Sequence, residues 1–374
     1  LRSQGIKILA VKEADAKSKR FKLRGKKVSF KELVVFTREL ATMIDAGVPL
    51  PRGLATLADQ AENKVFKDII TSLTRDIESG IPLADAMAKH PNTFGDVYVN
   101  MVRAGEAGGI LNEILKRLAT QVEKDSAMRH KIRSAMAYPV VILAVTVIAF
   151  FGIMLVIMPK IGKIIKDLGG PDAELPIYTQ VMLGASAFMQ DNAIFIIVAL
   201  AVAIWGFKRY IKTEKGKYRW HALLLRLPIF GKIIAKVVIA RFARTFSSLM
   251  GAGVSVLEAL EVTGKAVGNR VIQRELEEIA RNVKNGQSLG KQLVEAPFFP
   301  PIVGQMMLVG EETGKIDEIL VKVADFYEQE VDAVIDSLAS IIEPIMIVVL
   351  GSIVGLIAAS VMGPIAGLSK NIGG

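Results

Sequence analysis

"MIDAGVPL" at residues 43–50 returns as "LMGAGVSV" at residues 249–256. A phrase that recurs after a long interval indicates a duplicated unit. The match extends outward from these phrases, because the residues on either side also repeat 206 positions later. The aligned pairs are Phe36 with Phe242, Arg38 with Arg244, and Gly47 with Gly253.

The repeat continues after one residue drops out, and the offset becomes 205. "GEAGGI" at 105–110 aligns with "GEETGK" at 310–315. The aligned positions are Gly105 with Gly310, Glu106 with Glu311, Gly109 with Gly314, Tyr138 with Glu343, and Pro139 with Pro344. The duplicated unit therefore covers about 110 residues and ends in an apolar segment. Chance similarity does not hold one offset over such a length.

The apolar residues are gathered in blocks, which indicates a membrane protein. The chain has 374 residues and a net charge of +10, with a mean hydropathy of +0.40. "PVVILAVTVIAFFGIMLVIMP" at 139–159 contains no charged residue, and about 20 such residues in a helix span one hydrocarbon layer. Two further apolar runs occupy 193–207 and 344–368. We predict three transmembrane helices.

Lysine and arginine near the span ends set the predicted orientation. Basic residues cluster before the first span and after the second, whereas 160–192 is poor in them. Both repeats are therefore expected in the cytoplasm. The predicted order is an N-terminal fragment and basic linker (1–28), helical repeat 1 (29–135), transmembrane helix 1 (136–159), an extracytoplasmic loop (160–192), transmembrane helix 2 (193–210), helical repeat 2 (211–342), transmembrane helix 3 (343–368) and an extracytoplasmic tail (369–374).

Both repeats are predicted to be helical bundles. Ser29 followed by Glu32 is the pattern of a capping box, and apolar residues then recur at helical spacing. Gly47 ends this helix where a left-handed backbone is needed. Alternating strand patterns are absent from the repeats, although the first residues of the chain read as a short strand. The fold class is an all-α membrane protein.

Two duplicated charged positions allow a structural and a functional interpretation. Glu106 and Glu311 are expected near the N-terminus of the following helix, where the dipole favours an anion, or else they present a carboxylate to a partner or a cation. Arg38 and Arg244 form ion pairs or helix caps within each repeat, or else contact a partner. The sequence alone leaves both choices open.

The chain lacks the patterns of a catalyst. It contains no cysteine, its histidines are isolated, and "GQSLGKQ" and "GEETGKI" lack the spacing and Ser/Thr of a phosphate-binding loop. The apolar runs 139–159, 193–207 and 344–368 hold no charged residue, whereas a carrier usually places an ionisable group inside the membrane. We therefore predict no catalytic, cofactor-binding or metal-ligating residue. The basic run at 17–27 suits the anionic leaflet better than nucleic acid.

Small residues recur every four positions in the third span, at Gly351, Gly355, Ala359, Gly363 and Gly367. Small side chains allow close backbone approach, which favours helix packing in a bilayer. The expected partner is the other two spans, a second protomer, or the apolar helix of an incoming subunit.

These features resemble the PilC/GspF family, the inner-membrane platform proteins of type IV pilus and type II secretion machines. The likeness rests on "FTRELATMIDAGVPL" with "ARFARTFSSLMGAGVSVLEAL", and on "GEAGGIL" with "GEETGKIDEIL". "AYPVVIL" pairs with "EPIMIVVLG", and "RLPIFGKI" adds a further match. The resemblance spans essentially the whole chain.

The resemblance implies a multi-pass bacterial inner-membrane protein without enzymatic activity or cofactor, with its N-terminus in the cytoplasm. Its implied partners are hexameric pilus ATPases, pilin subunits, other inner-membrane alignment-complex proteins, the lipid bilayer, and further copies of itself in a dimer or higher oligomer. "GKKVSF" and "DFYEQEVD" favour a pilus over a secretion machine. A transporter or membrane enzyme subunit is the alternative from another class.

Overall fold

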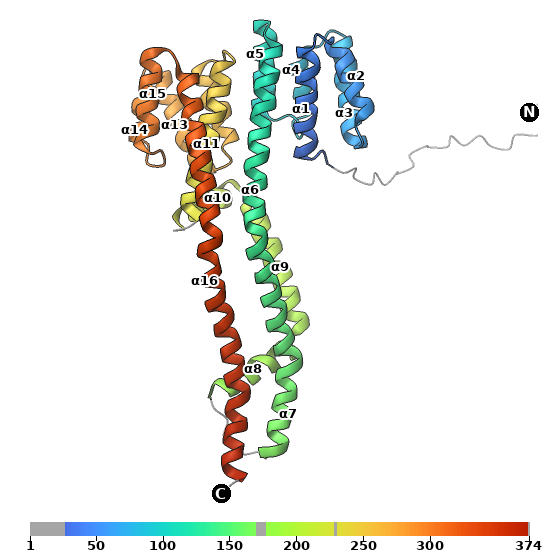
Figure 1. Ribbon diagram of the computed structural model, residues 1–374, viewed down its shortest axis with the longest axis vertical. Coiled ribbons are helices and arrows are strands. Elements are labelled where there is room, and N and C mark those ends of the chain that lie inside the picture. The colour runs from blue at the N-terminus through green and yellow to red at the C-terminus, as the bar shows by residue number, and fades with distance from the viewer. Residues whose placement is uncertain (1–26, 170–176, 228–229, 373–374) are drawn as a thin grey trace, which may run out of the picture.

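The computed structural model describes residues 27–169, 177–227 and 230–372, which are helical throughout apart from short connections (Figure 1). Nearly all of the N-terminal fragment 1–28, including the expected strand and most of the basic run, lies outside the described residues. The first repeat comprises α1 (Phe30–Asp45), α2 (Leu50–Gln60), α3 (Lys64–Glu78), α4 (Leu83–Ala88), α5 (Asp96–Gly108) and the start of α6 (Leu111–Gly152).

The second repeat follows the same order of helices, preceded by α10 (Glu214–Arg226). It comprises α11 (Phe230–Gly251), α12 (Val256–Ala266), α13 (Arg270–Lys284), α14 (Leu289–Glu295), α15 (Pro301–Thr313) and the start of α16 (Ile316–Ile372). Helices α1–α6 thus correspond to α11–α16. The duplication in the sequence is a duplication of the fold, and the all-helical prediction is confirmed for the described residues.

The predicted start and end of the first helix are confirmed. The Ser29 hydroxyl accepts from the backbone N–H of Glu32 at 3.2 Å, and the Glu32 carboxylate accepts from the N–H of Ser29 at 2.6 Å. Two backbone donors at the start of α1 are thereby satisfied. Gly47 ends the helix with φ of 80°, and its counterpart Gly253 has φ of 82°, a conformation in which a Cβ is strained.

Two helices of the described chain are long and apolar enough to cross a membrane: Leu111–Ile164 and α9 (Ala193–Ile211). The first consists of α6, a π-helical turn η2 (Ile153–Ile157) and most of α7 (Met158–Gly169). Their side chains are largely exposed, as lipid contact requires. Met346–Leu356 within α16 is a shorter apolar stretch, so the third span stays a proposal.

The segment 160–192 differs from the expected loop, because its described part is largely helical. It holds the end of α7 and all of α8 (Ile177–Asp191). Ser186 Oγ of α8 donates to the Met154 carbonyl at 2.5 Å, and Gln190 Nε2 donates to the Leu155 carbonyl at 2.7 Å. Both carbonyls belong to η2, where the i→i+5 pattern loosens the helix. Apolar side chains of α8 also pack against this turn around Met182. The burial of these side chains explains why α8 forms in a segment whose charge pattern predicted only a loop.

Both repeats lie at one end of the molecule, and α6 and α16 descend from them side by side (Figure 1). A single hydrophobic core runs through both repeats, from Phe36 and Phe94 in the first to Phe242 and Phe299 in the second. The repeats are therefore packed on each other. The predicted boundaries at 135/136 and 342/343 fall inside α6 and α16, since each helix continues from its repeat without a break.

Candidate functional site

The two repeated arginines form the same ion pair in each repeat. Arg38 Nε of α1 donates to Glu123 Oε1 of α6 at 2.5 Å, and its Nη2 binds the other carboxylate oxygen. Arg244 Nε of α11 donates to Glu328 Oε1 of α16 at 2.8 Å. Glu123 and Glu328 are 205 residues apart, so the carboxylates repeat as the arginines do. The sequence left open whether these arginines pair within each repeat or contact a partner. Their described contacts are ion pairs within each repeat.

The two pairs differ in burial. The Arg38 side chain is 52% exposed, whereas that of Arg244 is 11% exposed. The hydrogen bond to Glu123 raises the pKa of Arg38. Burial works to lower the pKa of Arg244, but its bonds to Glu328 and Asp325 outweigh this and raise it. Lys124 of the first repeat also binds Glu328 at 3.0 Å, so the second pair helps to join the repeats.

Glu106 and Glu311 each hold the N-terminus of a short helix. Glu106 accepts from the backbone N–H groups of Leu83 at 2.5 Å and Ala84 at 2.9 Å, in the first turn of α4. Glu311 accepts from Leu289 N at 2.8 Å and Gly290 N at 3.0 Å, in the first turn of α14. A carboxylate at this position satisfies free donors and the helix dipole.

The glutamates do lie at a helix N-terminus, as predicted. The prediction that it is the N-terminus of the following helix is wrong. The capped helices precede Glu106 and Glu311 in the chain, because the motif lies on the last turns of α5 and α15 and its side chains face α4 and α14. In the second repeat the Ser288 hydroxyl also donates to Glu311, at 2.6 Å. These contacts within the repeat agree with the structural interpretation of the glutamates.

The motif glycines allow two helices to meet closely. A Cβ at Gly105 would lie 2.8 Å from Ile114 Cγ1, and one at Gly310 would lie 3.0 Å from Ile316 Cα. Larger residues would push α5 from α6 and α15 from α16. Gly109 and Gly314 then reverse the chain with φ of 68° and 70°. The repeated Gly-Glu-x-x-Gly motif thus forms the turn of a helical hairpin in each repeat.

The motif residues at the start of the apolar segments lie on uninterrupted helices. Tyr138 is 55% exposed on α6, beside Pro139, which lies inside the helix. Pro344 is exposed on α16, and the side chain of Glu343 lies outside the described residues.

The described small residues of the predicted third span, Gly351, Gly355 and Ala359, face away from the rest of the described chain. No other side chain or distant backbone atom lies within 4 Å of a Cβ built at Gly351 or Gly355, and Ala359 is exposed. The side chains at 363 and 367 are outside the described residues. Packing of this stripe on the first two spans, one of three expected partners, is absent at Gly351 and Gly355.

An interface between the repeats is the feature that the sequence did not reveal. Gln121 Nε2 of α6 donates to Thr245 Oγ1 of α11 at 3.3 Å, and Ser248 Oγ donates to Gln121 Oε1 at 3.2 Å. Arg241 of α11 pairs with Asp125 of α6 at 3.4 Å. One signal was present, since Gln121 is polar where the second repeat has Phe326.

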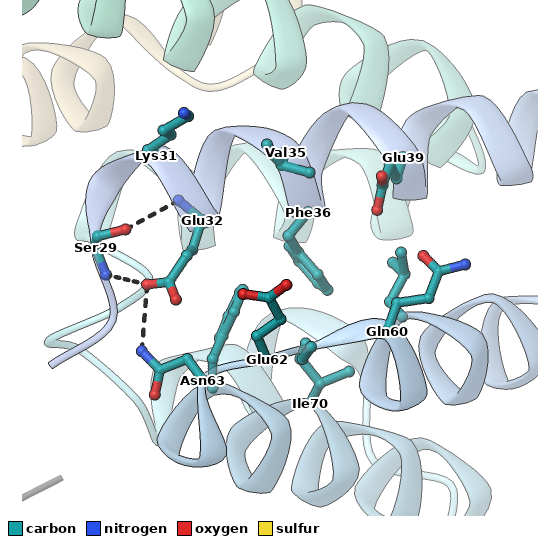
Figure 2. A pocket seen from close by; sticks show the side chains of 13 residues that line it. Ser29, Lys31, Glu32, Val35, Phe36, Glu39, Gln60, Glu62, Asn63 and Ile70 are labelled. Atoms are coloured by element: carbon teal, nitrogen blue, oxygen red, sulfur yellow. Dashed lines mark hydrogen bonds between the residues drawn. The ribbon is translucent and has the colours of Figure 1, made fainter. Parts of the chain in front are cut away.

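A hollow lies on the first repeat between α1, α2 and α3 (Figure 2). Ser29 and Asn63 both donate to Glu32 at its edge, Asn63 at 3.3 Å, and Val35 is 46% exposed beside it. Within the described residues, no group of three or more His, Asp or Glu side chains is placed to hold a metal ion.

Residues 36–159 and again 242–364 match the family of type II secretion system (T2SS) protein F. The chain belongs to this family. The two matches to protein F begin at Phe36 and Phe242, the first aligned pair of the duplication. This agrees with the resemblance seen in the sequence.

Curated relatives in the protein F family cover most of this chain. It is 40% identical over 336 residues to the type IV pilus assembly protein PilC of Thermus thermophilus, which covers 90% of this chain and 82% of the relative. It is 35% identical over 375 residues to PilC of Pseudomonas aeruginosa, covering 100% and 98%. It is 31% identical over 376 residues to the type II secretion system protein F of Aeromonas hydrophila, covering 100% and 96%.

Proposed function

We propose that this chain is the inner-membrane platform protein of a type IV pilus, coupling a cytoplasmic ATPase to the insertion of pilin subunits at the base of the filament. It has no catalytic step of its own in this proposal. Its partners are a hexameric ATPase, pilin subunits, inner-membrane alignment proteins and further copies of itself. The names of the relatives support pilus assembly, with identities of 40%, 38% and 35% for PilC proteins.

The observation that supports the proposed coupling is the length of α6 and α16, which run from the repeats into the apolar segments. α6 has 42 residues and α16 has 57, and each begins in a repeat; α6 runs without a break into the apolar segment as far as Gly152, and α16 runs through its apolar part. A continuous helix is stiff over this length, so a displacement of its repeat is transmitted along its axis. The repeats are well placed to receive force on one side of the membrane and deliver it to the other.

We further propose a three-span topology with both repeats in the cytoplasm. The third span is the apolar part of α16, and the small residues at 351 and 355 face a partner there. The N-terminus lies on the cytoplasmic side, and 160–192 with the C-terminal tail lies outside. Fusions of a reporter that is active only outside the cytoplasm, placed after residues 168, 212 and 372, test this order. Activity after 212 would contradict it.

The experiment for the function is deletion of the gene and complementation with this chain. We expect loss of surface filaments and of twitching in the deletion strain, and their return on complementation. Co-purification with the pilus ATPase from the same membranes tests the coupling step. Normal filaments in the deletion strain would overturn the proposal.

The second candidate is the F component of a type II secretion system. It is favoured by the 34% identity over 365 residues to that protein of Xanthomonas campestris. In the same deletion strain, retained filaments with loss of an exported enzyme from the medium would select this function.

A further inference from the structure

An apolar groove on the second repeat is open to solvent. It lies between α15 and α16, where Phe326 is 54% exposed, Ile302 45% and Met306 37%. Val323 and Tyr327 form its buried floor. Exposed apolar side chains gathered in one groove mark a contact surface more often than isolated ones do.

The same groove of the first repeat is covered. Its lining residues Val97, Leu118, Gln121 and Val122 lie 205 positions before Ile302, Val323, Phe326 and Tyr327. In the first repeat these residues share a cavity with Thr245 of α11 and Val262 of α12. The second repeat therefore covers the α5–α6 groove of the first, and nothing in the described chain covers the α15–α16 groove.

The surface that would cover it is also present and open. The counterparts of α11 and α12 are α1 and α2 of the first repeat. On them Val35, Thr42 and Thr56 are exposed, at positions equivalent to Arg241, Ser248 and Val262. Among the described residues α1 and α2 contact neither α15 nor α16. The contact between the repeats is thus head-to-tail. It leaves one surface of each kind uncovered: the α1–α2 face of the first repeat and the α15–α16 groove of the second.

We propose that the α15–α16 groove binds the α1–α2 face of a second copy of this chain, by the same packing that joins the two repeats. The inference deepens the proposed self-association of the platform by assigning its interface. A head-to-tail contact of this kind builds a ring if its rotation closes and an open row if it does not.

The direction of the long helices makes this contact possible in one membrane. α6 and α16 run side by side and descend from their repeats in the same direction (Figure 1). The rotation and translation that superpose the first repeat on the second therefore keep both repeats at the same end of the molecule. Applied once more, they place the next copy beside this one at the same depth in the bilayer.

One charge pair is expected at the new contact. Within the chain, the Arg117 guanidinium of α6 lies beside Gly251 at the end of α11. The equivalent positions are Lys322 on α16 and Asp45 on α1. Lys322 lines the open groove, and Asp45 pairs with Lys116 of its own chain at 2.6 Å while its side chain stays 46% exposed. The positive and negative side chains would meet at the equivalent point between two copies.

Disulfide cross-linking tests the contact directly, because the natural chain has no cysteine. Within one chain, Ser248 and Gln121 are hydrogen-bonded, and the equivalent pair between copies is Thr42 with Phe326. Two differently tagged full-length chains, one carrying Thr42→Cys and the other Phe326→Cys, are expressed in the same membrane and oxidised. The internal control is one chain with Gln121→Cys and Ser248→Cys.

We expect a mixed cross-linked dimer from the two tagged chains and none from either variant alone. A Phe326→Cys chain that dimerises alone would overturn the proposal, because it indicates a two-fold contact. The proposal also fails if the internal pair forms its disulfide and the mixed pair does not. Filaments are not scored, so failure of this contact is distinct from failure of the pilus function.

A second variant tests the groove without cysteine. Phe326→Glu places a charge among the apolar groove residues and is expected to shift the detergent-solubilised chain to a smaller assembly. Leu257→Glu is the matched control, since Leu257 is 38% exposed on α12 outside the groove. An unchanged assembly for Phe326→Glu, or an equal shift for Leu257→Glu, would contradict the assignment.

Discussion

Glu106 lies 23 residues after Leu83 in the chain, yet its Oε1 accepts a 2.5 Å hydrogen bond from the backbone N–H of Leu83. Glu311 makes the same bond to Leu289 at 2.8 Å. The duplicated carboxylate ties the last turns of one helix to the first turn of another. A bond of this kind fixes the angle between the two helices as well as satisfying the donors.

Replacing Glu311 by glutamine should destabilise the second repeat. The amide has a single acceptor oxygen and brings its own donors toward two backbone N–H groups, so we expect a cost of about 1–2 kcal/mol. The measurement is the thermal unfolding midpoint of the full chain in detergent, followed by circular dichroism. Glu312→Gln is the control, because Glu312 is exposed next to it. Equal midpoints for the two variants would show that the contact contributes nothing.

The two arginines should respond differently to removal. Arg38→Ala removes an exposed pair and should cost less than about 1 kcal/mol. Arg244→Ala leaves the largely buried Glu328 with Lys124 as its remaining cationic partner, and should cost about 2 kcal/mol, below the cost of a fully uncompensated buried charge. Unfolding of both variants by heat or denaturant gives the comparison. A larger loss for Arg38→Ala would contradict the ranking that burial predicts. A small loss for Arg38→Ala combined with weakened ATPase association would instead assign that arginine to a partner contact.

The duplication and the helix ends were predictable from the sequence because both depend on local chemistry. Ser29 with Glu32, and the glycine at 47, specify a helix start and a helix end through bonds to their own neighbours. The offset between Phe36 and Phe242 needs only an alignment of the chain with itself.

The contacts between helices were not predictable in the same way. Glu106 could cap any helix whose N-terminus lies near it, and the following helix was the nearest in sequence. The bundle instead turns its side chain toward α4. Gln121 gave a polar signal, but its partners Thr245 and Ser248 are more than 120 residues away. α8 was missed because apolar residues that bury against a π-helical turn have no distinct spacing.

The carboxyl group of Glu275 should make the second repeat less stable as pH rises. Burial on α13 raises its pKa to about 7, with Glu278 adding to the effect and a bond from the Phe298 backbone opposing it. The folded chain thus binds this proton more tightly than the unfolded chain does. The stability that Glu275 contributes is therefore greatest at acidic pH and is lost as pH rises from the ordinary carboxyl range to about 7.

Glu275→Gln tests this sign. The variant removes the charge, so we expect it to be more stable than the natural chain at pH 8 by about 1 kcal/mol, since partial exposure screens the effect. The difference should shrink near pH 5. Glu258→Gln, an exposed carboxylate on α12, is the control in the same melting series. A variant that is less stable at pH 8 would contradict the assignment.

His221 should give stability the opposite pH dependence from that of Glu275. Its Nδ1 accepts from the backbone N–H of Arg270 at 2.8 Å, and burial, with Lys217 nearby, lowers its pKa. The folded chain therefore disfavours the proton, and stability falls as pH drops below the ordinary histidine range. His221→Asn should remove this acidic loss. The test is the melting difference between pH 7.5 and pH 5.5 in the two chains, and an unchanged difference would refute it.

Gly355 in the proposed third span should be needed for assembly and not for folding. A Cβ at this position meets nothing within 4 Å in the single chain, so leucine fits there and also suits a bilayer. Gly355→Leu should therefore insert and fold normally, as judged by its membrane yield and melting. Close approach of a second protomer or an incoming subunit requires the small side chain, so we expect this variant to lose filament assembly. Val354→Leu is the matched control on the same turn, because Val354 is 54% exposed and already large. Filaments at the natural level from the Gly355→Leu strain would show that the stripe packs against no partner.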